Sequence, residues 1–161
     1  SFQSRCHNKS FRILSIQRLI HFAKTDMSNR VEEHILSKDQ TKLFVRKWNP
    51  ADKPKAVMVI VHGYLEHGGR YREFGEYLSS EHGICTIVYD ARGHGKSSGQ
   101  RGYAYNMEDL HQDLEAAMDY AHRDVVGEKP PLFVCAHSFG GLTFLDYARE
   151  NMALKDKIQG A

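Results

Sequence analysis

The sequence of 161 residues contains no apolar run close to the roughly 20 residues that a membrane-spanning helix needs. The apolar stretch after Ile13 is interrupted by Ser15, Gln17 and Arg18, which excludes a transmembrane helix there. Cysteine is scarce, with three residues at wide spacings, and we interpret these as reduced core thiols. We therefore expect an intracellular protein, either cytoplasmic or peripherally associated with a membrane.

A strong excess of one charge is also missing. The 22 lysines and arginines face 20 aspartates and glutamates, a formal net charge of +2, which excludes nucleic acid as the main partner. Residues 1–24, however, carry five bases and no acid in an amphipathic pattern. Such a segment is typical of an organelle-targeting leader, although a non-native upstream segment or a surface helix has the same composition. We assign residues 1–26 to this leader and residues 27–161 to the N-terminal part of one globular domain.

From Val31 onward, short β-rich stretches alternate with helical ones, after a hairpin predicted over residues 33–48. Three continuously apolar runs are typical of strands buried on both faces of a parallel sheet: residues 56–61, 84–89 and 132–136. Each precedes a stretch with helical spacing of apolar residues: residues 71–81, 107–123 and 141–151. This order predicts an α/β fold with a doubly wound, mostly parallel sheet. In such sheets the chemistry lies just beyond the carboxyl ends of the strands.

One serine follows the third apolar run and opens a helical stretch. Ser138 has small residues two positions away on each side, Ala136 and Gly140, as a sharp strand-to-helix turn requires. Such a turn exposes the hydroxyl and directs N–H groups of the helix start toward it, where they can stabilise an oxyanion. The pattern normally begins with glycine, and we interpret Ala136 as a tolerated departure. The alternative is an ordinary turn of small residues between a strand and a helix.

The segment after the first apolar run begins with His62 and Gly63. A turn of this kind lets the backbone N–H of Tyr64 point at a substrate carbonyl held over Ser138. The N–H of Phe139 would be the second donor of that oxyanion hole.

The same segment contains residues that resemble metal ligands. His62, Glu66 and His67 lack the His-Glu-x-x-His spacing of a zinc site and have no further ligand cluster nearby, so we predict no metal. We expect Glu66 and Arg70 to pair locally and to shape the loop.

The segment after the second apolar run contains Gly-Lys-Ser at residues 95–97, which is similar to a phosphate-binding loop. The first glycine of that motif is replaced by Asp90, and no helix follows Ser97, so we predict no nucleotide site. We interpret the segment as a glycine-rich loop that packs Asp90, Arg92 and His94 beneath the active-site face.

Together these segments resemble the Hydrolase-4 (serine aminopeptidase S33-like) branch of the α/β-hydrolase superfamily, and within it the monoglyceride lipase and lysophospholipase group. The matching residues are His62-Gly63, Glu66-His67, Arg70-Tyr71, Asp90, Arg92 to Gly95, Ser97 to Gly99, Arg101-Gly102, His137-Ser138 and Gly140-Gly141. The resemblance covers about residues 31–161. It implies an α/β-hydrolase fold, Ser138 as the acylated nucleophile, and Tyr64 and Phe139 as oxyanion donors. It also implies a small lipid ester as substrate, a monoacylglycerol or lysophospholipid, and no cofactor.

In this fold the catalytic acid and histidine follow the serine along the chain, and the resemblance places both, with the lid, beyond Ala161. Within the chain we expect His137 to point into the sheet, and Asp113 and Asp146 to be solvated helix carboxylates. We therefore interpret the chain as the N-terminal half of a serine hydrolase, truncated after the nucleophile helix and inactive alone. The alternatives are a non-catalytic product that binds lipid or a partner, and an acyltransferase, thioesterase or aminopeptidase on the same scaffold.

Overall fold

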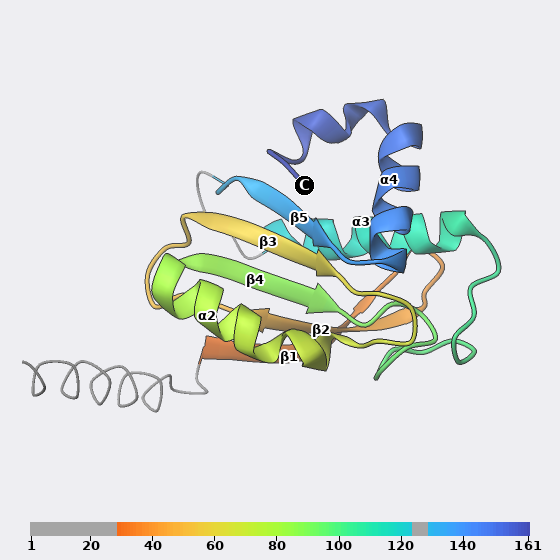
Figure 1. Cartoon of the computed structure of the whole chain (residues 1–161), viewed down its shortest axis with the longest axis horizontal. Coiled ribbons are helices and arrows are strands. Elements are labelled where there is room, and N and C mark those ends of the chain that lie inside the picture. The colour runs from red at the N-terminus through yellow and green to blue at the C-terminus, as the bar shows by residue number, and fades with distance from the viewer. Residues whose placement is uncertain (1–28, 124–128) are drawn as a thin grey trace, which may run out of the picture.

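The computed structural model describes residues 29–123 and 129–161, and within them a five-stranded mixed sheet of order β1-β2-β4-β3-β5 forms the centre (Figure 1). The strands are β1 (Arg30–Leu36), β2 (Lys42–Trp48), β3 (Ala56–Val61), β4 (Ile84–Tyr89) and β5 (Leu132–Ala136). β1 and β2 form an antiparallel hairpin, and β2 joins β4 antiparallel. β4, β3 and β5 are parallel. The three apolar runs thus form the parallel half of the sheet, with the bounds that the sequence predicts.

Helices cover both faces of the sheet. A short 3-10 helix, η2 (Gly68–Tyr71), leads into α2 (Arg72–His82), which packs on β2 and β4. α3 (Met107–Arg123) and α4 (Phe139–Glu150) pack on the opposite face and on each other, and η3 (Met152–Asp156) follows α4. Figure 1 shows α2 in front of the sheet and α3 behind it. The predicted α/β fold with helices on both faces is therefore confirmed.

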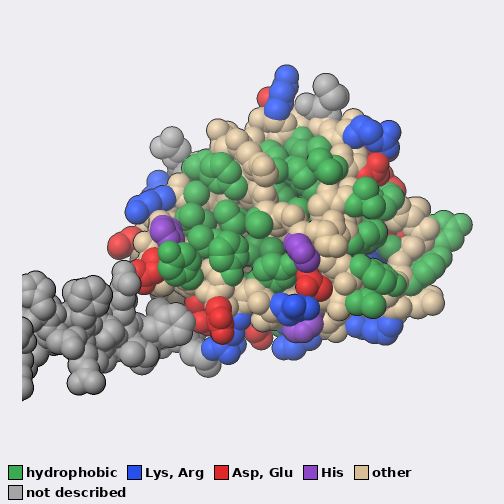
Figure 2. Space-filling model, in the orientation of Figure 1, with side chains coloured by type: hydrophobic (Ala, Val, Ile, Leu, Met, Phe, Trp, Pro, Cys, Tyr) green, Lys and Arg blue, Asp and Glu red, His purple; other side chains and the backbone are tan. Residues whose placement is uncertain are grey.

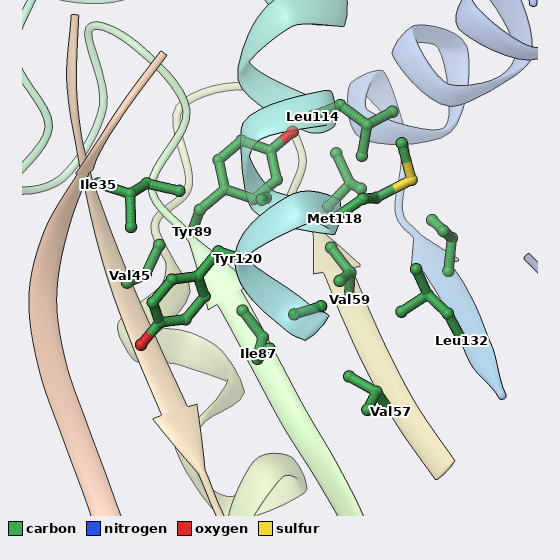
Figure 3. Close-up of a cluster of buried hydrophobic side chains, with 14 of the residues drawn as sticks. Ile35, Val45, Val57, Val59, Ile87, Tyr89, Leu114, Met118, Tyr120 and Leu132 are labelled. Atoms are coloured by element: carbon green, nitrogen blue, oxygen red, sulfur yellow. The ribbon is translucent and has the colours of Figure 1, made fainter. Parts of the chain in front are cut away.

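The core follows from the two-residue period of the strands. Alternate side chains of β3 and β4, among them Val57, Val59 and Ile87, pack against Leu114 and Met118 of α3 (Figure 3). The intervening side chains face the other way and form a second cluster beneath α2, made of Trp48, Ile60 and Val88. Because both faces of the parallel strands are covered by helices, these strands are apolar throughout.

Helix boundaries follow the predicted pattern to within two residues. α2 ends at His82 and is capped by Gly83, whose φ of 69° is the left-handed conformation that glycine adopts without strain. α4 begins at Phe139, two residues before the predicted start, because the helix begins directly after the turn at Ser138. Within the described ranges, no helix has the length and apolar character to cross a bilayer. The leader predicted over residues 1–26 lies outside the described residues.

Candidate active site

The loops that follow β3, β4 and β5 meet at one edge of the sheet. Figure 1 shows the arrowheads of these three strands pointing to the same side of the molecule. The approach is close: a Cβ atom built on Gly63 would lie 3.3 Å from the Cβ of Ser138 and 3.1 Å from Glu66 Oε2. The fold therefore brings together the loop after β3 and the turn at Ser138, as expected for the carboxyl edge of a parallel sheet.

Ser138 occupies a sharp and strained turn. Its φ of 53° and ψ of −119° lie in a region that L-residues rarely adopt, and its side chain makes no capping hydrogen bond to α4. The residue is exposed at the end of β5. Phe139 begins the helix, where backbone N–H groups have no partner within the helix. This is the geometry expected of a nucleophile elbow.

Gly140 explains how α4 approaches the sheet so closely. A Cβ atom at this position would lie 2.5 Å from the carbonyl oxygen of Val61 and 2.6 Å from that of His62. Real Cβ atoms do not approach backbone oxygens to such distances, so only glycine fits without movement of the main chain. Position 140 therefore requires glycine because the backbone at the end of β3 occupies the space that a side chain would need.

His137 does not point into the sheet, and that prediction is wrong. Its side chain is 63% exposed, and its Nδ1 lies 3.3 Å from Glu66 Oε2. The strand ends at Ala136, so the alternation of side chains between the two faces of the sheet stops before His137. The backbone N–H of His137 still donates to the Val61 carbonyl, while the imidazole turns toward the carboxylate of the neighbouring loop.

Glu66 connects this loop to the turn. Its Oε2 accepts hydrogen bonds from the Gly63 N–H at 3.0 Å and the Tyr71 hydroxyl at 3.2 Å, and its Oε1 lies 3.1 Å from Arg70. The Gly63 N–H lowers the pKa of Glu66, partial burial opposes this, and His137 and Tyr71 lower it further. Burial and the Glu66 charge raise the pKa of Tyr71 to about 12. The local pairing of Glu66 with Arg70 is confirmed.

Replacing Glu66 with glutamine is expected to weaken the acid dependence of stability. A carboxyl whose pKa is lowered by folding stabilises the native state above its unfolded value, here 4.5, and loses that contribution as the pH falls through the lowered value. The E66Q variant should be less stable at pH 7 by about 0.5–1.5 kcal/mol, the net worth of one hydrogen bond, and this difference should shrink below pH 4. Urea unfolding between pH 7 and pH 3 measures it.

The matched control is Asp52→Asn, which removes an exposed carboxylate from the loop between β2 and β3. Its unfolding curve should follow the wild-type curve at each pH. A Glu66→Gln variant with the same pH profile as wild type would show that the Glu66 contacts do not stabilise the loop.

His62 is buried and has both ring nitrogens engaged. Its Nε2 accepts a hydrogen bond from the Ala91 N–H at 2.9 Å, so the remaining proton is on Nδ1, which donates to the Gly63 carbonyl at 2.7 Å. Burial lowers the pKa of His62, which favours this neutral form. The side chain therefore ties the loop after β3 to the loop after β4. His67 has a local partner as well, since its Nδ1 accepts from the Gly69 N–H.

Asp90 is fully buried at the end of β4 and links the same two loops from below. Its Oδ1 accepts from the Gly68 N–H at 2.6 Å and from Arg46 Nη1 at 2.8 Å, and its Oδ2 accepts from the Lys96 N–H at 2.8 Å. A buried carboxylate with this set of donors has its hydrogen-bonding capacity satisfied. The predicted packing of this loop beneath the site is thus seen at Asp90.

Arg92 forms a bidentate ion pair with Asp113 that the sequence does not predict. Its Nε and Nη2 donate to the two oxygens of Asp113 at 2.8 and 2.7 Å, and its Nη1 donates to Asp39 at 2.9 Å. Asp113 is fully buried, so its assignment as a solvated helix carboxylate is wrong. Burial opposes the charge of Arg92, but the Asp113 and Asp39 contacts outweigh this and raise its pKa. The prediction for Asp113 failed because its partner, Arg92, comes from the loop after β4 rather than from α3 itself.

A pocket of about 310 Å³ lies beside the turn. The ring of Tyr64 forms one wall, 5.9 Å from the Phe139 ring and 5.7 Å from the His94 ring, and the Tyr64 hydroxyl donates to the Gly102 carbonyl at 3.0 Å. The remaining lining residues are Arg92, Tyr103, Ala104, Asn106, Met107 and Leu110. No motif marks residues 103–110, so the sequence prediction missed this part of the site.

His94 is buried beside this pocket. Its Nδ1 donates to the Arg92 carbonyl at 2.9 Å, and within residues 29–123 and 129–161 its Nε2 has no hydrogen-bond partner. Exposed hydrophobic side chains also belong to the loops at this edge: Tyr64, Leu65, Tyr103 and Tyr105. Figure 2 shows hydrophobic surface at the end of the molecule to which the parallel strands point.

The parallel strands, the helices on both faces and the strained serine turn define an α/β-hydrolase fold. Among solved structures, Est1E from Butyrivibrio proteoclasticus, in complex with ferulic acid, is similar with a TM-score of 0.66 and 25% identity, over 79% of this chain and 49% of that one. A carboxyl esterase from Bacillus coagulans has a TM-score of 0.65 at 22% identity, over 77% and 41%, and shows the fold alone. The family described as Hydrolase_4, serine aminopeptidase S33, matches residues 52–161, and the chain belongs to this family.

Curated relatives include lipases from animals and bacteria. Human monoglyceride lipase is 33% identical over 67% of this chain and 35% of its own length. Monoacylglycerol lipase from Mycolicibacterium smegmatis is 30% identical over 71% of this chain and 40% of its own length. The chain therefore spans well under half of the length of these relatives. The family match and these relatives confirm the predicted resemblance to the Hydrolase-4 branch.

Proposed function

We propose that the chain belongs to a serine hydrolase that cleaves the ester bond of monoacylglycerols or lysophospholipids through an acyl-enzyme. The observation that carries the proposal is the exposed, strained Ser138 turn between β5 and α4, within contact distance of Gly63. The similarity to proteins named monoglyceride lipase and monoacylglycerol lipase supports the substrate class.

In this mechanism the Ser138 hydroxyl oxygen attacks the ester carbonyl carbon, and the carbonyl oxygen becomes an oxyanion. The Phe139 and Tyr64 N–H groups donate to that oxyanion. The general base that takes the Ser138 proton then gives it to the alcohol that leaves, and water attacks the acyl-enzyme in the second half of the reaction. Release of the fatty acid regenerates the free serine.

The general base is, in this proposal, a histidine that follows α4 in the full-length protein, in the chain order of the fold. The histidines close to Ser138 have other partners. His62 bonds to Gly63 and Ala91, His94 to the Arg92 carbonyl, and His137 contacts Glu66. No step of the proposed reaction therefore depends on them as bases.

The pocket beside Ser138 supports an acyl substrate. Tyr64, Phe139, Met107 and Leu110 give it largely apolar walls, which suit a hydrocarbon chain. The exposed Leu65 at the same edge, with its aromatic neighbours, would favour contact with a lipid surface, so we propose peripheral membrane association during substrate uptake.

The test is a panel of substrates with the purified full-length protein. A monoacylglycerol and a lysophospholipid should be hydrolysed with a higher kcat/KM than a thioester or a peptide amide of similar size, and a fluorophosphonate probe should block this activity. Preference for the thioester or the amide would favour the alternative chemistries of the scaffold. A folded protein without turnover or labelling would favour a non-catalytic binding role.

A further inference from the structure

A buried histidine lies among three carboxylates where α3 meets α4. His111 of α3 is 4% exposed, and within residues 29–123 and 129–161 neither of its ring nitrogens makes a hydrogen bond. Glu108 stands one turn before it on α3, and Asp146 and Glu150 reach it from α4. A buried imidazole without hydrogen bonds is costly unless another group satisfies it.

The distances suit a metal ion better than hydrogen bonds. Nδ1 of His111 lies 3.8 Å from Glu108 Oε2 and 3.6 Å from Glu150 Oε2, which is too long for a hydrogen bond. The three atoms all lie within 4.8 Å of one another. In a tetrahedral site with zinc–ligand bonds of 2.0–2.1 Å, neighbouring ligand atoms are about 3.4 Å apart. A small contraction would therefore place all three atoms around one ion.

The other face of the imidazole also fits this interpretation. Nε2 of His111 lies 3.2 Å from Asp146 Oδ2, close to hydrogen-bond distance but without hydrogen-bond alignment, so a small rotation of the ring would let it donate. Metal-binding histidines usually donate their second N–H to a carboxylate, which fixes the ring and its tautomer. Asp146 is half-buried in this contact, so its interpretation as a solvated carboxylate is wrong. The Tyr147 ring packs edge-on against the imidazole, with centroids 5.5 Å apart.

Arg149 orients the carboxylates without occupying the site. It donates to Asp146 Oδ1 at 2.9 Å and to Glu150 Oε1 at 3.0 Å, which leaves Oδ2 and Oε2 directed at His111. With a neutral His111, three carboxylates and Arg149 give this cluster two net negative charges. A divalent cation would balance that charge.

We propose that Glu108, His111 and Glu150 bind a divalent cation of the zinc class, with Asp146 holding the histidine. One imidazole nitrogen and two carboxylate oxygens suit Zn²⁺, whereas Ca²⁺ and Mg²⁺ take oxygen ligands. Glu108 and Glu150 are 62% and 47% exposed, so the ion has access from solvent and room for a water ligand. The ion would join α3 to α4 and would take no part in the proposed hydrolysis.

The test is titration of the chelator-treated protein with Zn²⁺ by calorimetry, and with Co²⁺ by visible absorption. One equivalent should bind at this site and raise the midpoint of thermal unfolding. Asp146→Asn should weaken binding about 10–100-fold, the usual cost of losing an outer partner of a ligand. His111→Gln and Glu150→Gln each remove a ligand and should weaken it more than about 100-fold, beyond that range.

The control is Asp119→Asn, an exposed carboxylate of α3 outside the cluster, which should bind the metal as wild type does. Glu150→Gln changes an exposed side chain, so it tests the site even if the buried His111→Gln unfolds the interface. No saturable binding of Zn²⁺ would overturn the proposal, and the cluster would then be an ion pair of a protonated His111. Unchanged Zn²⁺ affinity in the Glu150→Gln variant would also overturn the proposal, because the ion would then be bound by other residues.

Discussion

The Ser138→Ala variant of the full-length protein is expected to lose both fluorophosphonate labelling and ester hydrolysis. Removal of a catalytic serine costs about 10⁶-fold in kcat in well-studied serine hydrolases, because no other group forms the acyl-enzyme. A residual rate of about 10³–10⁴-fold over water would remain from the oxyanion donors and substrate binding. Labelling followed by mass spectrometry, with hydrolysis measured on a monoacylglycerol, gives both readouts.

The control for this variant is Ser80→Ala, an exposed serine on α2 outside the site loops. It should be labelled and should hydrolyse esters like wild type. Ser138→Ala should keep the wild-type circular dichroism spectrum, since alanine adds no atoms to the turn. If the probe labels this variant as fully as wild type, Ser138 is not the nucleophile.

The Gly140→Ala variant is expected to damage activity and stability together. The added methyl would meet the carbonyl oxygens of Val61 and His62 at 2.5 and 2.6 Å, so the main chain of β3 or α4 has to move. Overpacking of this kind costs about 1–3 kcal/mol. Since a shift of about 1 Å in a reacting group can cost 10²-fold in rate, displacement of Ser138 should reduce kcat by a similar factor.

The neighbouring glycine provides a close control. At Gly141 the nearest atom to an added Cβ, the Ala136 carbonyl oxygen, is 3.8 Å away, an ordinary contact. Gly141→Ala should therefore keep activity and gain about 0.5–1 kcal/mol from the better helix propensity of alanine. The free energy of chemical unfolding and kcat, measured for both variants, test this difference between the two positions. Equal behaviour of the two variants would contradict the close approach of α4 to β3.

The parallel strands and the turn at Ser138 are predictable from local sequence. Strands covered on both faces must be apolar throughout, so the runs at residues 56–61, 84–89 and 132–136 identify β3, β4 and β5. The small residues on both sides of Ser138 are also a local signal, whereas the contact that requires glycine at position 140, with the carbonyl oxygens of Val61 and His62, comes from the end of β3. These parts of the fold can be predicted because short segments of sequence determine them.

The polar contacts across the molecule are not predictable in the same way. Asp113 lies on an amphipathic helix and resembles an exposed carboxylate until Arg92, 21 residues away, is placed against it. His137 depends on Glu66, 71 residues away, and the His111 cluster combines two helices. Periodicity records which face of an element is apolar. It does not record which charged group from another element meets that face.

The pairing of β3 with β5 also has a consequence for how the molecule folds. Val57 pairs with Cys85 across a short segment but with Leu132 across 75 residues. The entropic cost of closing a segment rises with its length, so we expect β3 and β4 to join before β5 docks. The strained Ser138 conformation depends on that docking, since Gly140 meets the end of β3 only then. We therefore expect the serine turn to form late in folding, after β5 and α4 have docked on β3.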